Sequence, residues 1–175
     1  MKRQYVKDYE LTEDKKRLVY RGAIFTADMP EGELRRAKTR MVLFAVLNGA
    51  AYLLAGVLGN QTTRTFYAGI PYALLVFPAA FAVIDAVKFY LRGAELERAH
   101  YEGSFLHLLV WSLTGMLFSA AAAVGGIIYL VRAAQPPLAE YFFPALAAAM
   151  CALALLLWKQ ARIVNKNIRE KDVSV

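Results

Sequence analysis

Residues 81–111, FAVIDAVKFYLRGAELERAHYEGSFLHLLVW, join two long apolar runs through a short polar turn. Asp85 lies just before the turn and His107 just after it, each inside an otherwise apolar segment. Ionisable side chains are costly in such segments, so they tend to face the interior of a protein and to find partners there. The stretch predicts two membrane-spanning helices joined by a polar turn, with Asp85 and His107 as the first candidates for a functional site.

The composition of the whole chain is typical of a membrane protein. Of its 175 residues, 58% are hydrophobic and 20% are charged, and the mean hydropathy is +0.37. Soluble domains average about 45–50% apolar and about 25% charged residues. The single cysteine, Cys151, excludes an internal disulfide and every paired-cysteine redox or zinc motif. Because the chain has only two histidines, a His-rich metal site is not available within one chain.

Four apolar runs are long enough to cross a bilayer as helices, which takes about 20 residues. Backbone in lipid must satisfy its own hydrogen bonds, so each run is predicted to be helical. We therefore expect an all-α integral membrane bundle over residues 41–158. A polar cytoplasmic head (1–40) runs into it as an interfacial helix, and a basic, helical cytoplasmic tail (159–175) follows it. The predicted spans are residues 41–59, 66–89, 105–131 and 141–158, the third beginning only after Gly103.

The distribution of Lys and Arg predicts the orientation of the bundle. These residues number 11 in residues 1–40, 3 in 88–104 and 5 in 158–175, whereas the other two linkers contain only Arg64 and Arg132. The positive-inside rule then places both termini and the middle turn in the cytoplasm of a plasma-membrane protein. Anionic lipid headgroups explain the basic excess, so we expect no nucleic-acid partner. Residues 1–40 lack the pattern of a cleavable signal peptide, so the first span is expected to direct insertion.

The polar head permits two local structures. Thr12 can cap a helix that stops at Gly22. The alternative is a strand over residues 18–26, which are rich in β-branched and aromatic side chains. Both remain open. Pro30 followed by Glu31 is typical of a helix start, and that helix is predicted to run into the first span without a break.

Small residues and prolines predict how the helices pack. Helices in lipid associate where small side chains let their backbones approach. The Gly125–Gly126 pair is interpreted in this way, and Pro71 and Pro78 predict a bend in the second span. Rows of small residues indicate packing within the bundle or a homo-oligomer interface. These rows are Ala51, Ala55 and Gly59; Gly115, Ser119 and Ala123; Ala145 and Ala149; Ala148 and Ala152.

Three polar side chains, Asn48, Asp85 and His107, are predicted at one depth in three different spans. At a rise of about 1.5 Å per residue, each lies within roughly 10 Å of the cytoplasmic interface. Together they form a candidate ligand- or proton-binding cluster open to the cytoplasm. The structural alternative is that Asp85 pairs with Lys88, that Asn48 bonds to a neighbouring helix and that His107 reaches water or headgroups.

Motifs that carry chemistry are absent from the sequence. It contains no HExxH zinc motif, no P-loop, no GxSxG and no Gly-rich dinucleotide fingerprint. No nucleophile with an adjacent base is visible either. We therefore predict no catalytic residue, no metal site and no cofactor, and an enzyme acting on a lipid or a cytoplasmic substrate is the weakest interpretation.

Two functions remain from the sequence. The first is an accessory or interaction protein of the plasma membrane, whose cytoplasmic head, middle turn and tail bind a membrane-protein partner. The second is a small transporter or channel subunit that uses Asn48, Asp85 and His107 together with the bent second span. In size and number of spans the chain resembles small multidrug transporters. Those carry a membrane-embedded Glu in the first span, and residues 41–59 contain none, so no site residue follows from the resemblance.

Overall fold

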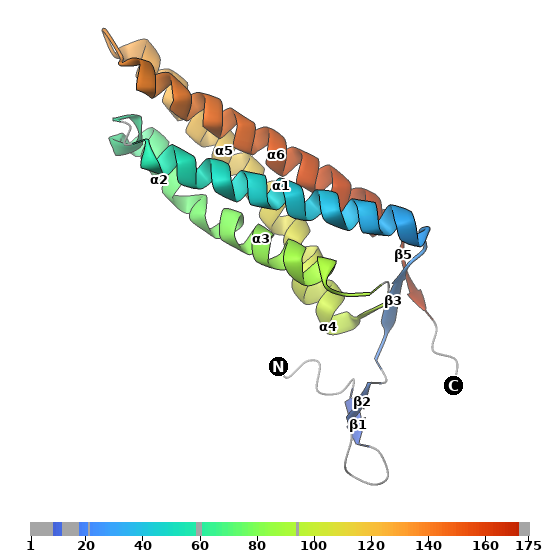
Figure 1. The fold of residues 1–175 in the computed structure, drawn as a ribbon. Coiled ribbons are helices and arrows are strands. Elements are labelled where there is room, and N and C mark those ends of the chain that lie inside the picture. Colours follow the sequence, from blue (N-terminus) through green and yellow to red (C-terminus); the bar gives the residue numbers. More distant parts are fainter. Residues whose placement is uncertain (1–8, 12–17, 21, 59–60, 94, 172–175) are drawn as a thin grey trace.

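Four helical segments lie side by side in one elongated bundle in the computed structural model (Figure 1). The structure describes residues 9–11, 18–20, 22–58, 61–93 and 95–171. Within these residues, four helices are long and apolar enough to cross a membrane, which confirms the predicted set of four apolar helices. The segments are α1 (Glu31–Val57); α2 (Phe66–Leu74) with α3 (Val76–Tyr90); α4 (Arg98–His100), the π-helical turn η3 (Tyr101–Leu106) and α5 (His107–Arg132); and α6 (Phe142–Lys166).

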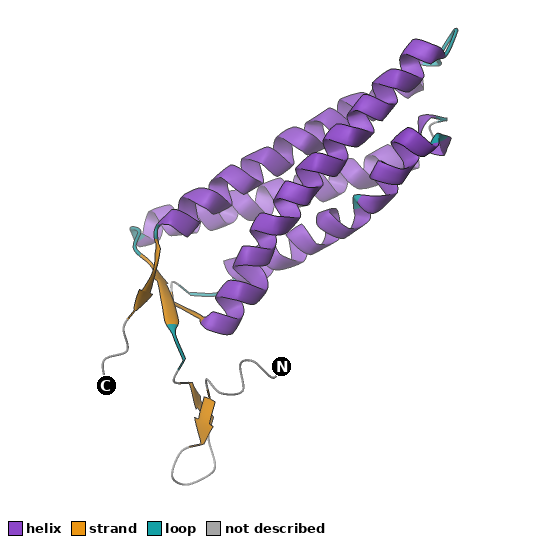
Figure 2. Cartoon of the chain, turned by 180° about the vertical axis from the view of Figure 1, so that it is seen from behind, coloured by secondary structure: helices purple, strands orange, loops and turns teal. Residues whose placement is uncertain are grey.

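The two ends of the bundle differ in structure. At one end, here the loop end, the connections are short and contain the 3-10 turns η2 (Thr62–Arg64) and η4 (Leu138–Tyr141). At the other, here the sheet end, the chain forms a small sheet from β3 (Ile24–Ala27), β4 (Glu95–Glu97) and β5 (Ile168–Lys171). A further hairpin, β1 (Tyr9–Leu11) with β2 (Leu18–Tyr20), lies beyond this sheet (Figure 2).

The sheet brings together three segments that are far apart in the sequence. Its strand order is β4-β3-β5, and both pairings are antiparallel. Ile24 in the central strand lies opposite Glu97 on one side and Lys171 on the other. The Asp28 backbone N–H extends the β5 side by donating to the carbonyl of Asn167 at 2.7 Å. The sheet therefore connects the start of α1, the turn before α5 and the end of α6.

Before α1, the regular structure of the described part of the head is extended, as in the second alternative. Strands occupy Leu18–Tyr20 and Ile24–Ala27, so a helix ending at Gly22 is wrong over the first of these segments. Thr12 lies outside the described residues. Strand pairing explains the outcome, because the β-branched and aromatic side chains of this segment favour a pleated surface over a helix. Helix α1 begins at Glu31 with Pro30 at its N-cap and continues unbroken to Val57, as predicted.

The third long helix begins earlier than expected. It starts at Arg98 and passes through Gly103 in the π-helical turn, so the prediction that Gly103 ends continuity is wrong. Glycine lowers helix propensity by only about 1 kcal/mol, and tertiary packing readily outweighs that amount. Here Phe105 is fully buried, and the Tyr101 hydroxyl donates to Asn165 Oδ1 at 2.8 Å. These anchors hold the extra turn against α6.

The tail also departs from the expected helix. Helix α6 extends to Lys166, and the chain then turns extended, so that Ile168–Lys171 form β5 instead of continuing the helix. The backbone N–H and C=O groups of residues 168–171 pair with β3, a partner that helical periodicity alone cannot indicate. Residues 172–175 lie outside the described part of the chain.

Small residues set the closest helix contacts, although not all of the predicted rows do so. A Cβ on Gly125 would lie 2.7 Å from the Tyr67 carbonyl oxygen, and one on Gly126 would lie 3.0 Å from Pro144 Cβ, which confirms close packing there. In α6 the predicted rows are exposed, because a different stripe of the helix faces the bundle. The exposed residues are Ala145, Ala148, Ala149 and Ala152; the buried stripe is Phe143, Ala147, Met150, Ala154, Leu157 and Ala161.

Candidate functional site

The predicted polar cluster is brought together only in part. Asp85 in α3 is 3% exposed, and its carboxylate lies 3.7 Å from the Lys88 ammonium on the next turn of the same helix. It also interacts electrostatically with His107 at the start of α5, whose side chain is exposed. A buried carboxylate paired with Lys88 is therefore present at this depth. The second span is interrupted ten residues earlier, where Leu75, between Pro71 and Pro78, separates α2 from α3.

Asn48 occupies a separate position in the first span. Its residue is 5% exposed, and its Oδ1 atom is buried with no hydrogen-bond partner within the described residues. An unpaired buried amide oxygen is unfavourable by about 1–3 kcal/mol. The cavity beside the sheet and the two cavities between α1 and α3 are lined by other residues, so none of these three joins Asn48, Asp85 and His107 into one pocket.

Lys38, which was not among the predicted site residues, organises the sheet end. Its ammonium donates to the carbonyl oxygens of Arg92 at 2.6 Å and Gly93 at 2.9 Å, just past the end of α3. It also lies over the Phe89 ring, 4.8 Å from the ring centroid. A cation at the C-terminal end of a helix is stabilised by the partial negative charge there. Its position in the sequence could have indicated this role, because Lys38 falls on the buried stripe of α1 with Leu34, Met41 and Ala45.

An aromatic ladder connects this cation to the sheet. Phe25 in β3 stacks on Tyr101 with ring centroids 4.4 Å apart, and Tyr101 faces Phe105 at 5.9 Å. Phe105 in turn contacts Phe89 at 4.8 Å, the ring over which Lys38 lies. Such ring pairs contribute about 0.5–1.5 kcal/mol each beyond the area they bury. The sheet is thus fixed to α3, η3 and α1.

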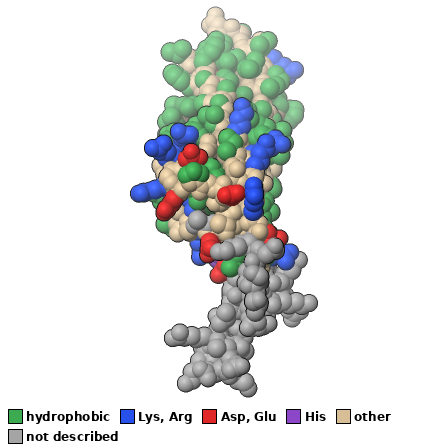
Figure 3. Space-filling model, turned by 90° about the vertical axis from the view of Figure 1, so that its right-hand side faces the viewer, with side chains coloured by type: hydrophobic (Ala, Val, Ile, Leu, Met, Phe, Trp, Pro, Cys, Tyr) green, Lys and Arg blue, Asp and Glu red, His purple; other side chains and the backbone are tan. Residues whose placement is uncertain are grey.

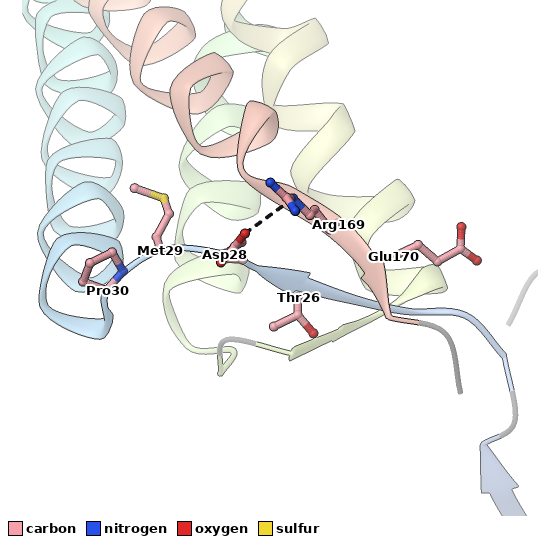
Figure 4. A pocket seen from close by; sticks show the side chains of 7 residues that line it. Thr26, Asp28, Met29, Pro30, Arg169 and Glu170 are labelled. Atoms are coloured by element: carbon pink, nitrogen blue, oxygen red, sulfur yellow. Dashed lines mark ion pairs between the residues drawn. The ribbon is translucent and has the colours of Figure 1, made fainter. Parts of the chain in front are cut away.

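A cavity of about 470 Å³ opens where the sheet meets α1, and most of its lining comes from β3, β5 and the segment leading into α1 (Figure 4). The Asp28 carboxylate, just past β3, and the Arg169 guanidinium in β5 form an ion pair at 3.4 Å in its lining. Thr26 Oγ1, another lining group, is buried without a hydrogen-bond partner within the described residues. The cavity therefore combines an exposed ion pair with a buried hydroxyl that has no partner within the described residues.

The surface around the sheet end is rich in positive charge. Figure 3 shows Lys and Arg side chains gathered between the apolar surface of the bundle and the sheet. Exposed side chains from α1, α3, α6 and the segment just past α3 contribute to this belt: Arg35, Arg36, Arg40, Lys88, Arg92, Lys159 and Arg162. At the loop end, the exposed basic residues within the described chain are Arg64 and Arg132.

Glu140 is the second residue that sequence reasoning missed, and it joins the two connections at the loop end. Its carboxylate is 3% exposed and accepts three hydrogen bonds: from the Gln61 N–H at 2.7 Å, the Thr62 N–H at 3.0 Å and the Thr62 hydroxyl at 2.6 Å. The N–H groups belong to the start of η2, where a negative charge is favourable. One sequence feature could have indicated this role: Glu140 is the one carboxylate in the two linkers at the loop end.

Within the described residues, no group of three or more His, Cys, Asp or Glu side chains is arranged to hold a metal ion. The chemically distinctive features are the buried Asp85, the Lys38 cap with its aromatic ladder, and the charged cavity beside the sheet. Comparison of the chain with protein-family models, with curated proteins and with solved structures finds no match.

Proposed function

We propose that this chain is a multi-pass plasma-membrane protein with both termini in the cytoplasm, and that it acts as an interaction protein. Its sheet end docks a cytoplasmic part of a partner complex. The observation that carries the proposal is the β4-β3-β5 sheet, which gathers the head, the middle turn and the tail into one surface. The cytoplasmic side follows from charge, since 19 of the 21 Lys and Arg residues belong to these three segments.

The contacts beneath the sheet support a docking role. The ladder from Phe25 through Tyr101 and Phe105 to Phe89 gives the sheet a fixed attachment to the helices. A fixed surface binds a partner with less ordering entropy to lose than a flexible segment does. The cavity beside Asp28 and Arg169 adds a concave, charged feature of the kind that determines specificity.

The orientation is tested by cysteine labelling, because the chain has one cysteine to remove. In a Cys151→Ser background, Glu170→Cys reports the sheet end and Leu138→Cys, at a residue 78% exposed, reports the loop end. A membrane-impermeant maleimide added to intact cells is expected to label the Leu138→Cys protein and to spare the Glu170→Cys protein. The opposite labelling pattern would place the sheet outside and overturn the assignment.

The interaction is tested by site-specific photo-crosslinking in the native membrane. A photoreactive amino acid is placed at Glu170 or at Asp28 on the sheet end, with Leu138 at the loop end as the control. We expect one and the same protein crosslinked from both sheet positions and absent from Leu138. Its yield should fall with Phe25→Ala, which removes the first step of the ladder. No crosslink at either sheet position, or an equal yield from Leu138, would contradict the proposal.

A small transporter or channel subunit is the second candidate, favoured by one observation. Buried Asp85 beside His107, with the unpaired Oδ1 of Asn48 in the first span, has the chemistry of a proton or ligand site. This function predicts pH-dependent uptake into proteoliposomes that Asp85→Asn abolishes. Flux that is unchanged by both Asp85→Asn and His107→Ala would remove the support for it.

A further inference from the structure

Two cavities lie along the same seam between α1 and α3, one near the sheet end and one deeper in the bundle. The first has a volume of about 260 Å³ and the second about 510 Å³. The first is lined by Glu31, Leu34, Arg35, Lys38, Tyr90, Arg92 and Gly93. The second includes Val46, Gly49, Ala50 and Leu53 from α1, and Ala79, Ala80, Val83 and Ile84 from α3.

The α1 residues of both cavities belong to one stripe of the helix. Successive α1 residues in this set are three, four or eight positions apart, so their side chains share one face of the helix. The set is Arg35, Lys38, Val46, Gly49 and Leu53. Helix α3 runs antiparallel beside this stripe, from Ile84 at the deeper cavity to Arg92 just past its end at the first one. The two cavities therefore follow one another along the same α1–α3 seam.

The first cavity is suited to an anion. Arg35, Lys38 and Arg92 contribute three cations and Glu31 one carboxylate, so these side chains carry a net charge of +2. Two of the three donors of the Lys38 ammonium are used by the Arg92 and Gly93 carbonyls, which leaves one. Arginine binds phosphate oxygens through two parallel N–H groups, and both arginines of the cavity are exposed.

The second cavity is suited to a hydrocarbon chain. Small side chains at Gly49, Ala50, Ala79 and Ala80 create the hollow, and Val46 and Leu53 border it with exposed apolar surface. The helices are already in contact at its base, where a Cβ on Gly49 would lie 3.6 Å from Val83 Cγ2. Its occupant in a membrane is therefore a slender apolar group that lies along the groove.

The distance between the two cavities fits one molecule that has both an anionic group and a hydrocarbon chain. Eight residues separate Lys38 from Val46, which corresponds to roughly 12 Å along a helix. One leaflet of a bilayer has a hydrocarbon depth of roughly 15 Å. We infer that the α1–α3 seam binds an anionic phospholipid, with its phosphate at Arg35 and Arg92 and an acyl chain in the groove beside Gly49. A transmembrane helix of a partner would fill the apolar groove but would leave the cationic cavity without a role.

The inference requires insertion into a membrane but not the interaction function proposed above. Failure of membrane insertion and failure of lipid binding give different experimental results. Reconstituted protein that fails to insert, as measured by the labelling experiment, would overturn the membrane placement together with this site. Inserted protein without selective lipid binding would overturn the site alone.

Native mass spectrometry of the full chain in a mild detergent tests the site. The protein is titrated with dioleoyl phosphatidylglycerol or with dioleoyl phosphatidylcholine, which have the same chains but differ in net headgroup charge. We expect at least about tenfold tighter binding of the anionic lipid, which is equivalent to about 1.4 kcal/mol. Equal binding of the two lipids would overturn the inference, as would complete displacement of the anionic lipid by inorganic phosphate, which would indicate a site for free phosphate.

Variants test whether the anionic lipid binds at this seam or at the basic belt as a whole. Arg35→Gln with Arg92→Gln should reduce the preference for the anionic lipid to near unity. Ala50→Leu with Ala80→Leu fills the groove at two exposed positions and should weaken binding of both lipids. The matched control, Lys159→Gln with Arg162→Gln, removes the same charge from α6 and should leave binding unchanged. An equal loss of lipid binding in the control variant would contradict a defined site, as would unchanged binding in the groove variant. Circular dichroism checks that each variant keeps its helices.

Discussion

Lys38 in α1 donates a hydrogen bond of 2.6 Å to the main-chain carbonyl oxygen of Arg92, so one buried cation holds the end of α3 against α1. The same ammonium reaches Gly93 at 2.9 Å and the face of Phe89 at 4.8 Å from the ring centroid. A lysine that is 6% exposed requires this combination, because an uncompensated buried charge is strongly unfavourable.

Lys38→Met keeps the aliphatic stem and removes the charge and its hydrogen bonds. We expect the free energy of unfolding to fall by about 2 kcal/mol, since helix-end charges and cation–π contacts contribute on that scale when they are partly buried. Titration with a denaturing detergent in mixed micelles measures the change. Lys159→Met, at an exposed lysine of the same end, is the control and should change the value by less than about 0.5 kcal/mol.

Glu140→Gln should loosen the loop end. The carboxylate accepts bonds from Gln61 and Thr62, and charge-assisted hydrogen bonds contribute about 1.5–3 kcal/mol each. We expect a loss of about 2–3 kcal/mol for Glu140→Gln and less for Thr62→Val, which removes one of the three bonds. A double-mutant cycle between the two should give a coupling of about 1 kcal/mol or more. Strict additivity would show that the hydroxyl contributes independently of the charge.

Gly125→Ala should destabilise the bundle although alanine is the better helix former. Its Cβ would lie 2.7 Å from the Tyr67 carbonyl oxygen and 2.8 Å from Ala68 Cα, both backbone atoms that cannot move away cheaply. Overpacking of this kind reduces stability by about 1–3 kcal/mol. Gly32→Ala is the matched control, because nothing lies within 4 Å of its added Cβ, and its stability should be unchanged or higher. Equal behaviour of the two variants in thermal unfolding would show that α5 does not approach α2 closely.

Asp85→Asn should leave stability unchanged or raise it by about 1 kcal/mol. The carboxylate is buried, whereas its partner Lys88 has a side chain that is 58% exposed, so removing the negative charge leaves no buried cation behind. Removing one partner of an ion pair is strongly destabilising when it leaves the other charge buried and uncompensated, which is not the case for the exposed Lys88. Thermal unfolding in detergent checks this outcome. A loss of more than about 1 kcal/mol would show that the Asp85–Lys88 pair is structural and would weaken the transporter alternative.

The helices could be predicted from the sequence because their signal is local. Long apolar runs, the start at Pro30 and the close contact at Gly125 each depend on neighbouring residues or on a simple steric requirement. The three-stranded sheet could not be predicted, since strands of three or four residues carry little periodicity and pair with partners far away in the chain. The burial of Lys38 and of Glu140 likewise depends on groups supplied by other segments.

The sequence indicated which polar residues lie in the spans, but not how their side chains are arranged. Asp85 is buried and lies 3.7 Å from Lys88 on its own helix, a pairing that the spacing of three residues indicated. Depth along a helix does not give rotation about its axis, so the exposure of His107 and the unpaired oxygen of Asn48 could not be derived in the same way. Whether the three residues bind a ligand stays a prediction.

The central position of β3 also sets the order in which the protein can be completed during synthesis. Strand β3 precedes every long helix in the chain, whereas β5, its partner, follows the last one. The N–H and C=O groups on one edge of β3 therefore lack their β5 partners until all four helices have been synthesised. A chain cut short before Ile168 would keep that edge open, which is the kind of edge that recruits other chains into aggregates.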